Sequence, residues 1–280
     1  MSGSGAASGG PTPDALDTAV VIVNYRTKAL TSEAVASALG ETEVKEVVVV
    51  DNASGDDSAD YLRRAHVDPR LQVLQSEWNR GFGPAVNFGA AAACHSPLLL
   101  ILNSDATLVP GSLGTLARAL MQDETMGVIA PAVYESDGQS LQPVAYGRLP
   151  KRRDILLGNG WARPGLRHGR DAASPGWVSG VAMLLRRADF LAIGGFDEGF
   201  SMYFEDIDLC RRIREAGKSV RREPSAGVVH RGGKSWHSRR DQKRRFHESK
   251  LRYFRKLGVS RVELLGVRLR GAVRTSVVRR

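Results

Sequence analysis

The first half of this 280-residue chain switches repeatedly between short apolar runs and amphipathic stretches. Runs of consecutive apolar residues are typical of strands buried on both faces, and amphipathic stretches are typical of helices. The predicted strands cover 19–23, 47–50, 71–75, 98–102, 127–134 and 177–185. The predicted helices cover 31–39, 112–121, 188–193 and 206–216. Two further helices are predicted, one that contains Tyr61 and Leu62 and one that starts near Pro84. Strands that alternate with helices at this spacing predict right-handed βαβ units. We therefore expect an α/β fold with a mostly parallel central sheet flanked by helices.

Three segments do not follow this pattern. Residues 1–17 are rich in Gly, Ser and Pro and lack the basic region and apolar core of a signal peptide, so we expect a disordered N-terminal arm. Residues 135–176 hold many Gly, Pro and Arg without a clear period, which predicts a long irregular segment. Residues 237–280 place apolar side chains at spacings of three and four with Lys and Arg between them. This last pattern predicts a basic amphipathic helical tail.

The net charge of the chain is +10, and the basic residues gather at its carboxyl end. Residues 231–280 hold 17 Lys and Arg against 3 Asp and Glu, a net charge of +14, so residues 1–230 carry −4. Such a tail suits an anionic membrane surface or another polyanion, and the alternative is a helix that caps the domain with a solvated basic face. The two cysteines form no disulfide framework, which fits a reducing cytosol, and no apolar run approaches the length of a membrane span.

Polar residues follow three of the predicted strands and the short apolar pair Val228-Val229, at the point where each of them ends. They are Asn24-Tyr25, Asp51-Asn52, Asn103-Ser104-Asp105 and His230. Parallel strands bring their carboxyl ends to one edge of a sheet, where ligands bind in open α/β folds, so we expect these side chains to converge. Asp105 can hold Mg²⁺ or Mn²⁺ against a diphosphate, and a mixed Asp and His site suits Mn²⁺ slightly better. For each residue taken singly, turn or helix-capping chemistry is the structural alternative.

Three acids, Glu205, Asp206 and Asp208, fall within four positions at a predicted helix start. Acids in a first turn complement the helix dipole, which accounts for one or two of them. The adjacent pair Glu205-Asp206 follows the apolar residues 202–204, and apolar walls with a like charge nearby raise a carboxyl pKa, as a general base requires. The chain has neither a G-x-x-x-x-G-K-[ST] loop nor a G-x-G-x-x-G turn after its first strand, which argues against a P-loop enzyme or a dinucleotide fold.

Eight short motifs in the chain form a recognisable series over residues 18 to 236. They are Val21-Ile-Val-Asn-Tyr25, Val49-Val-Asp51-Asn52-Ala-Ser54, Asn79-Arg-Gly-Phe-Gly-Pro-Ala-Val-Asn87, Leu102-Asn-Ser-Asp105, Val178-Ser-Gly-Val-Ala182, Gly194-Gly-Phe-Asp-Glu198, Phe204-Glu-Asp-Ile-Asp-Leu209 and His230-x-x-Gly-x-Ser235. Together they resemble family-2 glycosyltransferases of the GT-A fold, in particular rhamnosyltransferases of bacterial cell-surface polysaccharide assembly. The resemblance implies one domain over 18–236, with a nucleotide-binding half over 18–134 and an acceptor half over 135–236.

The resemblance also implies residue roles. The nucleotide would be bordered by Asn24 and Tyr25 in the base pocket, by Asp51 facing the pyrimidine or ribose, and by Asn52, Asn79 and Gly81 beside them. Asn103-Ser104-Asp105 would take the place of the family's Asp-x-Asp motif, with Asp105 and His230 as ligands of Mn²⁺ or Mg²⁺. Asn103 stands where the family has an Asp, which leaves the metal one charge poorer. Asp206, or else Glu205, would be the catalytic base.

The expected activity is inverting transfer of a sugar, rhamnose by family likeness, from a UDP- or dTDP-sugar to a hydroxyl. The acceptor would be a glycan or a lipid-linked sugar in cell-envelope polysaccharide synthesis. The protein would be cytoplasmic, and peripheral on the inner face of the plasma membrane if residues 246–280 bind anionic lipid. One alternative is a sugar-phosphate nucleotidyltransferase, which would need a Gly-rich loop with Arg where this chain has Asn24-Tyr25-Arg26-Thr27. Another is a non-catalytic protein that binds a polyanion or a nucleotide sugar, although we do not expect nucleic acid as a partner.

Overall fold

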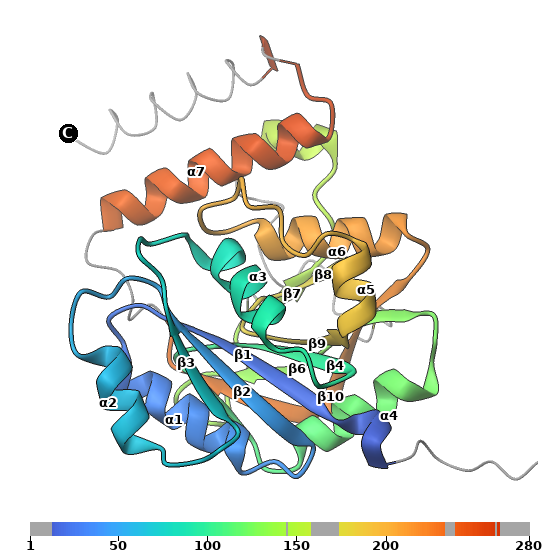
Figure 1. The fold of residues 1–280 in the computed structure, drawn as a ribbon. Coiled ribbons are helices and arrows are strands. Elements are labelled where there is room, and N and C mark those ends of the chain that lie inside the picture. Colours follow the sequence, from blue (N-terminus) through green and yellow to red (C-terminus); the bar gives the residue numbers. More distant parts are fainter. Residues whose placement is uncertain (1–12, 144, 158–173, 233–238, 261, 264–280) are drawn as a thin grey trace, which may run out of the picture.

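An eight-stranded sheet forms the centre of the molecule, with helices on both of its faces (Figure 1). The structure, a computed structural model, describes residues 13–143, 145–157, 174–232, 239–260 and 262–263. Its strands are β1 (Thr18–Asn24), β2 (Val44–Asp51), β3 (Leu71–Gln75), β4 (Leu98–Asn103), β5 (Ala106–Leu108), β6 (Met126–Tyr134), β7 (Tyr146–Gly147), β8 (Trp177–Val178), β9 (Ala182–Arg186) and β10 (Ser219–His230). Its helices are α1 (Lys28–Leu39), α2 (Ser58–Ala65), α3 (Phe82–Ala92), α4 (Ser112–Gln122), α5 (Arg187–Ala192), α6 (Glu205–Glu215) and α7 (Arg239–Lys256), with 3-10 turns at Pro13–Leu16 and Arg152–Leu157.

The strand order β3-β2-β1-β4-β9-β6-β10-β5 confirms the predicted α/β sheet and explains where its functional edge lies. Strands β1 to β4 are parallel to one another, and the register pairs Asn24 with Asp51 and Val23 with Asn103. Strand β9 runs antiparallel to both β4 and β6, so the two reversals cancel, and β10 is parallel to β6. The end of β10 at His230 therefore lies on the same edge as the ends of β1, β2 and β4.

The sheet departs from the sequence-based prediction at two places. The predicted strand 177–185 is two strands, because the chain turns at Ser179–Val181: β8 pairs with β7 in a small second sheet, and β9 joins the main sheet. The three-residue strand β5 was not predicted. It follows β4 in the chain but pairs antiparallel with β10, so that Ala106 lies opposite His230.

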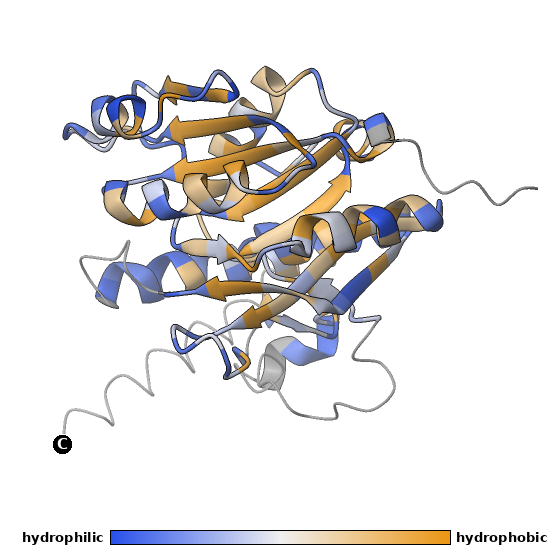
Figure 2. Ribbon diagram, turned by 90° about the horizontal axis from the view of Figure 1, so that it is seen from below, coloured by the Kyte–Doolittle hydropathy of each residue, from blue (hydrophilic) through white to orange (hydrophobic). Residues whose placement is uncertain are grey.

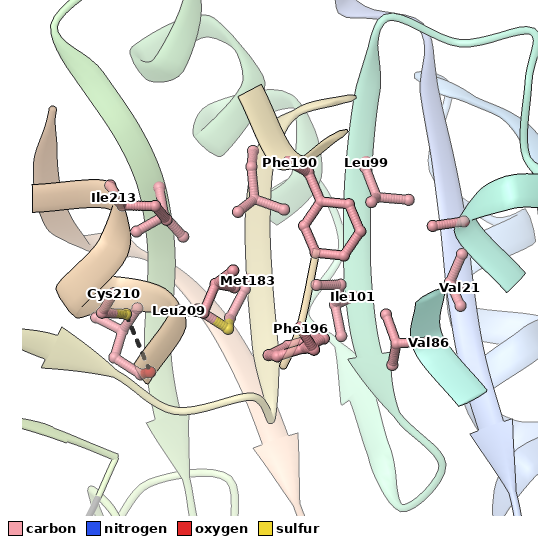
Figure 3. Close-up of a cluster of buried hydrophobic side chains, with 14 of the residues drawn as sticks. Val21, Val86, Leu99, Ile101, Met183, Phe190, Phe196, Leu209, Cys210 and Ile213 are labelled. Atoms are coloured by element: carbon pink, nitrogen blue, oxygen red, sulfur yellow. Dashed lines mark hydrogen bonds between the residues drawn. The ribbon is translucent and has the colours of Figure 1, made fainter. Parts of the chain in front are cut away.

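Two hydrophobic layers hold the helices against the sheet. One layer packs α3, α5 and α6 on one face, where Val86, Phe190 and Leu209 meet Leu99 and Met183 (Figure 3). The other packs α1, α2 and α4 on the opposite face. Most strands of the central sheet are mainly hydrophobic, β10 is mixed, and the helices carry many hydrophilic positions (Figure 2). Each fully buried aliphatic side chain contributes about 1.5–3 kcal/mol, so these layers are the main source of stability.

Helix α7 packs against the segment that leads into α6 (Figure 1). Leu251, Tyr253 and Phe254 of α7 are buried, and Lys256 forms ion pairs with Asp197 and Asp208. The described part of the predicted basic tail is therefore a domain-capping helix, and the rest of that tail lies outside the described residues. Across the described residues, no helix combines the length and apolar character needed to cross a bilayer.

Candidate active site

The ends of β1 and β2 form a buried polar cluster. The Asn24 amide donates from Nδ2 to Asp51 Oδ1 at 2.7 Å and to Ser54 Oγ at 3.1 Å, and the Ser54 hydroxyl also donates to Asp51 Oδ1. Thr31 donates to Asn24 Oδ1 at 2.8 Å. Asn24 and Asp51 are each at most 3% exposed, so these bonds fix the position of both side chains where the two strands end.

Asn52 connects this cluster to the loop before α3. Its Nδ2 donates to Asn79 Oδ1 at 3.2 Å and to Gly81 O at 3.1 Å, while Arg80 N donates to Asn52 Oδ1 at 2.9 Å. Gly81 has a φ of 86°, and a Cβ at this position would lie 2.5 Å from Ser201 O. Glycine is therefore required twice over, by its backbone conformation and by its close contact with residue 201.

Tyr25 and Ser104 complete the sequence-predicted nucleotide residues. The Tyr25 ring is partly exposed at the end of β1, with the Arg26 guanidinium 5.3 Å from its centroid. Ser104 is buried, and its Oγ accepts a hydrogen bond from Thr27 Oγ1 at 3.2 Å. The backbone amide of Thr27 donates to Asn24 Oδ1 at 3.3 Å, so one network joins the ends of β1, β2 and β4. The structure thus brings these predicted residues to one edge.

Asp105 and His230 meet on the same edge. His230 Nε2 lies 3.1 Å from Asp105 Oδ1 and 3.3 Å from Asn103 Nδ2. Pairing of β5 with β10 brings them together, because Ala106 is opposite His230 and Arg231 N donates to Asp105 O. In the described part of the chain, no group of three or more His, Cys, Asp or Glu side chains gathers as a metal site. The protein thus offers a pair of donors, to which phosphate oxygens would have to be added.

Gln142 determines which atom His230 presents to Asp105. Gln142 Nε2 donates to His230 O at 2.8 Å and to Glu135 Oε2 at 3.1 Å, so its Oε1 is the atom that faces His230 Nδ1, at 2.9 Å. Nδ1 then carries a proton, and Nε2 faces both the Asp105 carboxylate and the Asn103 amide. Nε2 and Asp105 Oδ1, 3.1 Å apart, can share either a proton or a metal cation. An imidazole nitrogen and a carboxylate oxygen are donor types that fit Mn²⁺ or Mg²⁺.

Glu205 and Asp206 begin α6 after a strained turn. Tyr203 and Phe204 both have a φ of 67°, a region that costs a non-glycine residue about 1–3 kcal/mol. Burial, together with the neighbouring Asp206 charge, raises the pKa of Glu205 well above its ordinary value, and Glu205 Oε2 has no hydrogen-bond partner. Burial also raises the pKa of Asp206, despite hydrogen bonds from the backbone amides of Gly180 and Ile207. Both carboxyls therefore hold protons more tightly than exposed acids do, as a base must.

Asp208 has a different role from its two neighbours. It is fully buried, but ion pairs with Lys256, Arg211 and Arg212 outweigh the effect of burial and lower its pKa. Arg212 also donates to the backbone oxygens of Ile193 and Gly195. The third acid of the cluster is therefore a structural anion that holds α6 in place.

A single turn separates the candidate base from the candidate metal ligands. Gly180 N donates to Asp206 Oδ2 at 3.1 Å, and the next residue, Val181, accepts at its oxygen from Asn103 N at 2.9 Å. Asp206 and the Asn103–Asp105 segment thus flank the same two residues between β8 and β9. Asp206 and Asp105 share no hydrogen-bond partner within the described residues.

Two contributors to this site were missed by sequence reasoning. Gln142 lies in the segment 135–176, whose irregular composition gave no sign of a fixed residue. The chain returns along the end of β6, where Gln142 N donates to Val133 O, and this path brings Gln142 to His230. Gly180 lies inside what the hydrophobic pattern predicts as one strand. Its small size was the available signal, since a Cβ there would lie 3.2 Å from the Phe82 ring and 3.8 Å from Asp206 Cβ.

The site and the fold can now be compared with known proteins. A family model described as "Glycosyl transferase family 2" matches residues 19–208. The N-acetylglucosaminyl-diphospho-decaprenol L-rhamnosyltransferase of Mycobacterium tuberculosis (strain ATCC 25618 / H37Rv) is 31% identical over 205 residues, 66% of each chain. The succinoglycan biosynthesis protein ExoU of Rhizobium meliloti (strain 1021) is 33% identical over 220 residues, 75% of this chain and 60% of that protein.

The architecture agrees with this sequence similarity. The crystal structure of GalNAc-T7 with UDP, GalNAc and Mn²⁺ superposes with a TM-score of 0.63 at 16% identity, covering 84% of this chain and 47% of that one. At that identity the likeness shows the fold, which is GT-A as the motifs predict. The chain spans 66% of the length of the mycobacterial rhamnosyltransferase. With its family model, its relatives and its sheet in agreement, the chain belongs to glycosyltransferase family 2.

Proposed function

We propose that this protein is an inverting glycosyltransferase that moves a sugar from a UDP- or dTDP-sugar to a hydroxyl of a glycan or lipid-linked acceptor. The observation that carries the proposal is the turn at Gly180–Val181, which has Asp206 on one side and the Asn103–Asp105 segment with His230 on the other. A sugar whose diphosphate lies at Asp105 and His230 would present its anomeric carbon toward Asp206. The non-catalytic alternative leaves this juxtaposition without a purpose.

Asp206 is the proposed base. As the acceptor oxygen forms its bond to the anomeric carbon, Asp206 removes the hydroxyl proton, and the bond from that carbon to the diphosphate oxygen breaks with its electron pair. Attack from the side opposite the leaving group inverts the configuration. The raised pKa of Asp206 brings its basicity nearer to neutral pH, and the amide of Gly180 holds its carboxylate in one orientation.

Asp105 and His230 are the proposed ligands of a divalent cation, Mn²⁺ or Mg²⁺. When bound, the cation would neutralise charge that grows on the leaving diphosphate. The asparagine at position 103 contributes an amide rather than a second carboxylate, and its Nδ2 lies against His230 Nε2 at 3.3 Å. A site with one protein carboxylate has lower affinity than one with two, so the diphosphate would contribute strongly to retention of the metal.

The proposed nucleotide-binding residues lie at the ends of β1, β2 and β4 and in the loop before α3. They are Asn24, Tyr25, Asp51, Asn52, Asn79, Gly81, Asn103 and Ser104. Their support is the single hydrogen-bonded edge that the structure builds from the ends of β1, β2 and β4. The activity named for the mycobacterial relative makes L-rhamnose the first sugar to test, and a polyprenyl-diphosphate-linked N-acetylglucosamine the first acceptor. We place the reaction in cell-envelope polysaccharide synthesis on the same support.

A transfer assay tests this proposal directly. The purified chain is incubated with UDP- or dTDP-sugars and with the polyprenyl-linked acceptor, with and without Mn²⁺, and the glycosylated lipid is measured. We expect product from a pyrimidine nucleotide sugar, and a loss of about 10²- to 10⁴-fold in kcat for Asp206→Asn. Asp206→Asn removes a partly buried negative charge but places an amide NH₂ against one of the two backbone amides that the carboxylate accepts, so its thermal stability is measured alongside. Substantial turnover by this variant would reject Asp206 as the base.

We also propose that the basic carboxyl end brings the enzyme to an anionic membrane face, where a lipid-linked acceptor would be available. Its support is the net charge of +14 over residues 231–280 and the apolar spacing of that segment. On this proposal, the protein is cytoplasmic and binds peripherally to the inner face of the plasma membrane. The exposed basic residues of α7, such as Arg240, Lys243 and Arg255, would form its described part.

A further inference from the structure

The turn that precedes the candidate base is contacted by a helix that lies beyond the matched family region. The turn consists of Ser201–Phe204, and the helix is α7. The family model ends at residue 208, whereas α7 covers Arg239–Lys256. Figure 1 shows α7 next to α6, with the turn between them.

The turn needs outside support because of its backbone. Tyr203 and Phe204 are consecutive non-glycine residues in the left-handed region, each with a φ of 67°. Phe204 is also the residue that caps α6, and a phenylalanine side chain offers no hydrogen bond to the free amides of a helix start. Such a conformation persists where surrounding contacts determine it.

Helix α7 supplies these contacts to three successive residues of the turn. Ser249 Oγ donates to Met202 O at 2.7 Å, and Gln242 Nε2 donates to the Tyr203 hydroxyl at 2.8 Å. The Phe246 ring lies against both aromatic rings of the turn, with centroids 5.6 Å from Tyr203 and 5.4 Å from Phe204. Every one of these side chains projects from the same helix.

The carboxyl end of α7 fixes its position relative to α6. Lys256 pairs with the fully buried Asp208 at 2.7 Å and with Asp197 at 2.7 Å, and Arg252 pairs with Asp197 at 2.6 Å. Tyr253, buried and 5.6 Å from the Phe204 ring, adds an apolar contact between these two sets of bonds. The helix is therefore tied to α6 and to the turn at points along its length.

We propose that α7 is a positioning element for the catalytic base, with Gln242, Phe246 and Ser249 as the positioning residues. They hold the left-handed turn in the one conformation that directs the Asp206 carboxylate to Gly180 N and buries Glu205 beside it. The inference rests on the proposed function, because it takes Asp206 to be the base. It adds that the base is set by residues outside the family-defining region.

The test measures kinetics of Gln242→Leu, Phe246→Ala and Phe246→Leu, with Glu248→Ala as the control. Glu248 lies on α7 but is exposed and pairs with Arg244 of the same helix, so its variant should match the wild type. We expect Gln242→Leu and Phe246→Ala to lower kcat by roughly 10- to 100-fold through misplacement of the base, with the KM for the donor changed by less than about twofold. Phe246→Leu, which keeps an apolar side chain, should recover most of the loss.

The pH profile separates positioning from a merely structural role. If the turn loosens, the partly exposed Asp206 gains further contact with water, its pKa falls toward the ordinary value, and the acid limb of kcat against pH moves to lower pH. Variants that lose thermal stability but keep the wild-type pH profile and the wild-type kcat per folded molecule would overturn the proposal. If the wild type is active and Gln242→Leu is unaffected, the positioning role of α7 is rejected and the proposed function stands. If the wild type is inactive with every donor and acceptor, the proposed function is rejected as well.

Discussion

At the scale of single residues, the site depends on groups placed where an ordinary residue would be unstable. Gly81 has a positive φ and touches Ser201 O, and Glu205 is a buried acid with an oxygen that lacks a hydrogen bond. Both residues are visible in the sequence, as part of a glycine-containing loop and of an acidic pair. The sequence does not show why position 81 needs a glycine or why Glu205 is buried. The reason lies in the backbone of residues 201–204, more than a hundred positions from Gly81.

Gly81→Ala should destabilise the protein more than Gly55→Ala does. Both glycines have positive φ, which costs an alanine about 1 kcal/mol, but nothing lies within 4 Å of a Cβ at Gly55, whereas one at Gly81 would overlap Ser201 O. Urea denaturation of the two variants measures the difference, and thermal shift by UDP measures the effect on the nucleotide edge. Equal free energies of unfolding for the two variants would mean that the Ser201 contact relaxes without cost.

Glu205→Gln should become more stabilising, relative to the wild type, as the pH rises. The folded-state pKa of Glu205 is raised by burial, so above the unfolded value the native state binds more protons and its stability falls with increasing pH. Each unit of the raised pKa corresponds to about 1.4 kcal/mol at pH values above the folded pKa. Free energies of unfolding for both proteins from pH 5 to pH 8, roughly the range where native proteins are most stable, test this.

Asp208→Asn is the matched control, because its sign is opposite. The pKa of Asp208 is lowered by its three cationic partners, so its stabilising contribution is present above the ordinary carboxyl pKa and is lost as the pH falls through the lowered one. Asp208→Asn should therefore destabilise the protein at neutral pH and matter less in acid. The same pH dependence for both variants would contradict the assignment of Glu205 and Asp208 to different roles.

At the scale of elements, the hydrophobic pattern located the strands and helices of the parallel half well. Strand β3 has the predicted bounds, and β4 and α4 each differ by one residue at an end, because long apolar runs and glycine stops are local signals. The pattern could not find β5, whose three residues after Asp105 carry too little periodicity. Nor could it divide 177–185, since both resulting strands are apolar and only the pairing partners differ.

The hydrogen bond between Gln142 and His230, at the end of β10, gives a prediction about the proposed metal ligands. Gln142→Leu removes the acceptor that keeps the proton on Nδ1 of His230, so we expect a loss of roughly 10- to 100-fold in Mn²⁺ affinity, close to the effect of His230→Ala. Gln139→Leu is the control, because residue 139 is exposed in the same segment. Titration of transfer activity with Mn²⁺ at fixed donor checks this, and an unchanged titration for Gln142→Leu would remove Gln142 from the site.

At the scale of the whole molecule, the charge distribution separates the sheet from the carboxyl end. Composition showed this separation, but it could not show that α7 is buried on one side while it exposes basic residues on the other. The burial of Tyr253 and Phe254 depends on partners such as Phe204, which no local pattern connects to them. The convergence of Asn24, Asp51, Asn103 and His230 was predictable because parallel strands impose it.

The membrane proposal is tested at this scale by flotation of the full chain with liposomes. We expect binding to vesicles that contain anionic phosphatidylglycerol, release by added salt, and no binding to neutral phosphatidylcholine vesicles. A chain that stops after Ser260 keeps α7 and removes most of the predicted apolar spacing, and it should bind more weakly. Failure of the full chain to float with anionic vesicles at low salt would end the proposal.

The path of β5 also has a consequence for the order in which parts of the protein fold during translation. Asn103 and His230 are 127 positions apart, and β5 can pair only after β10 has been synthesised. During translation, the edge formed by β1, β2 and β4 can assemble early, because its contacts are nearer in sequence. The pair Asp105 and His230 is completed late, so a nascent chain would acquire its nucleotide edge well before the part of the site that handles the diphosphate.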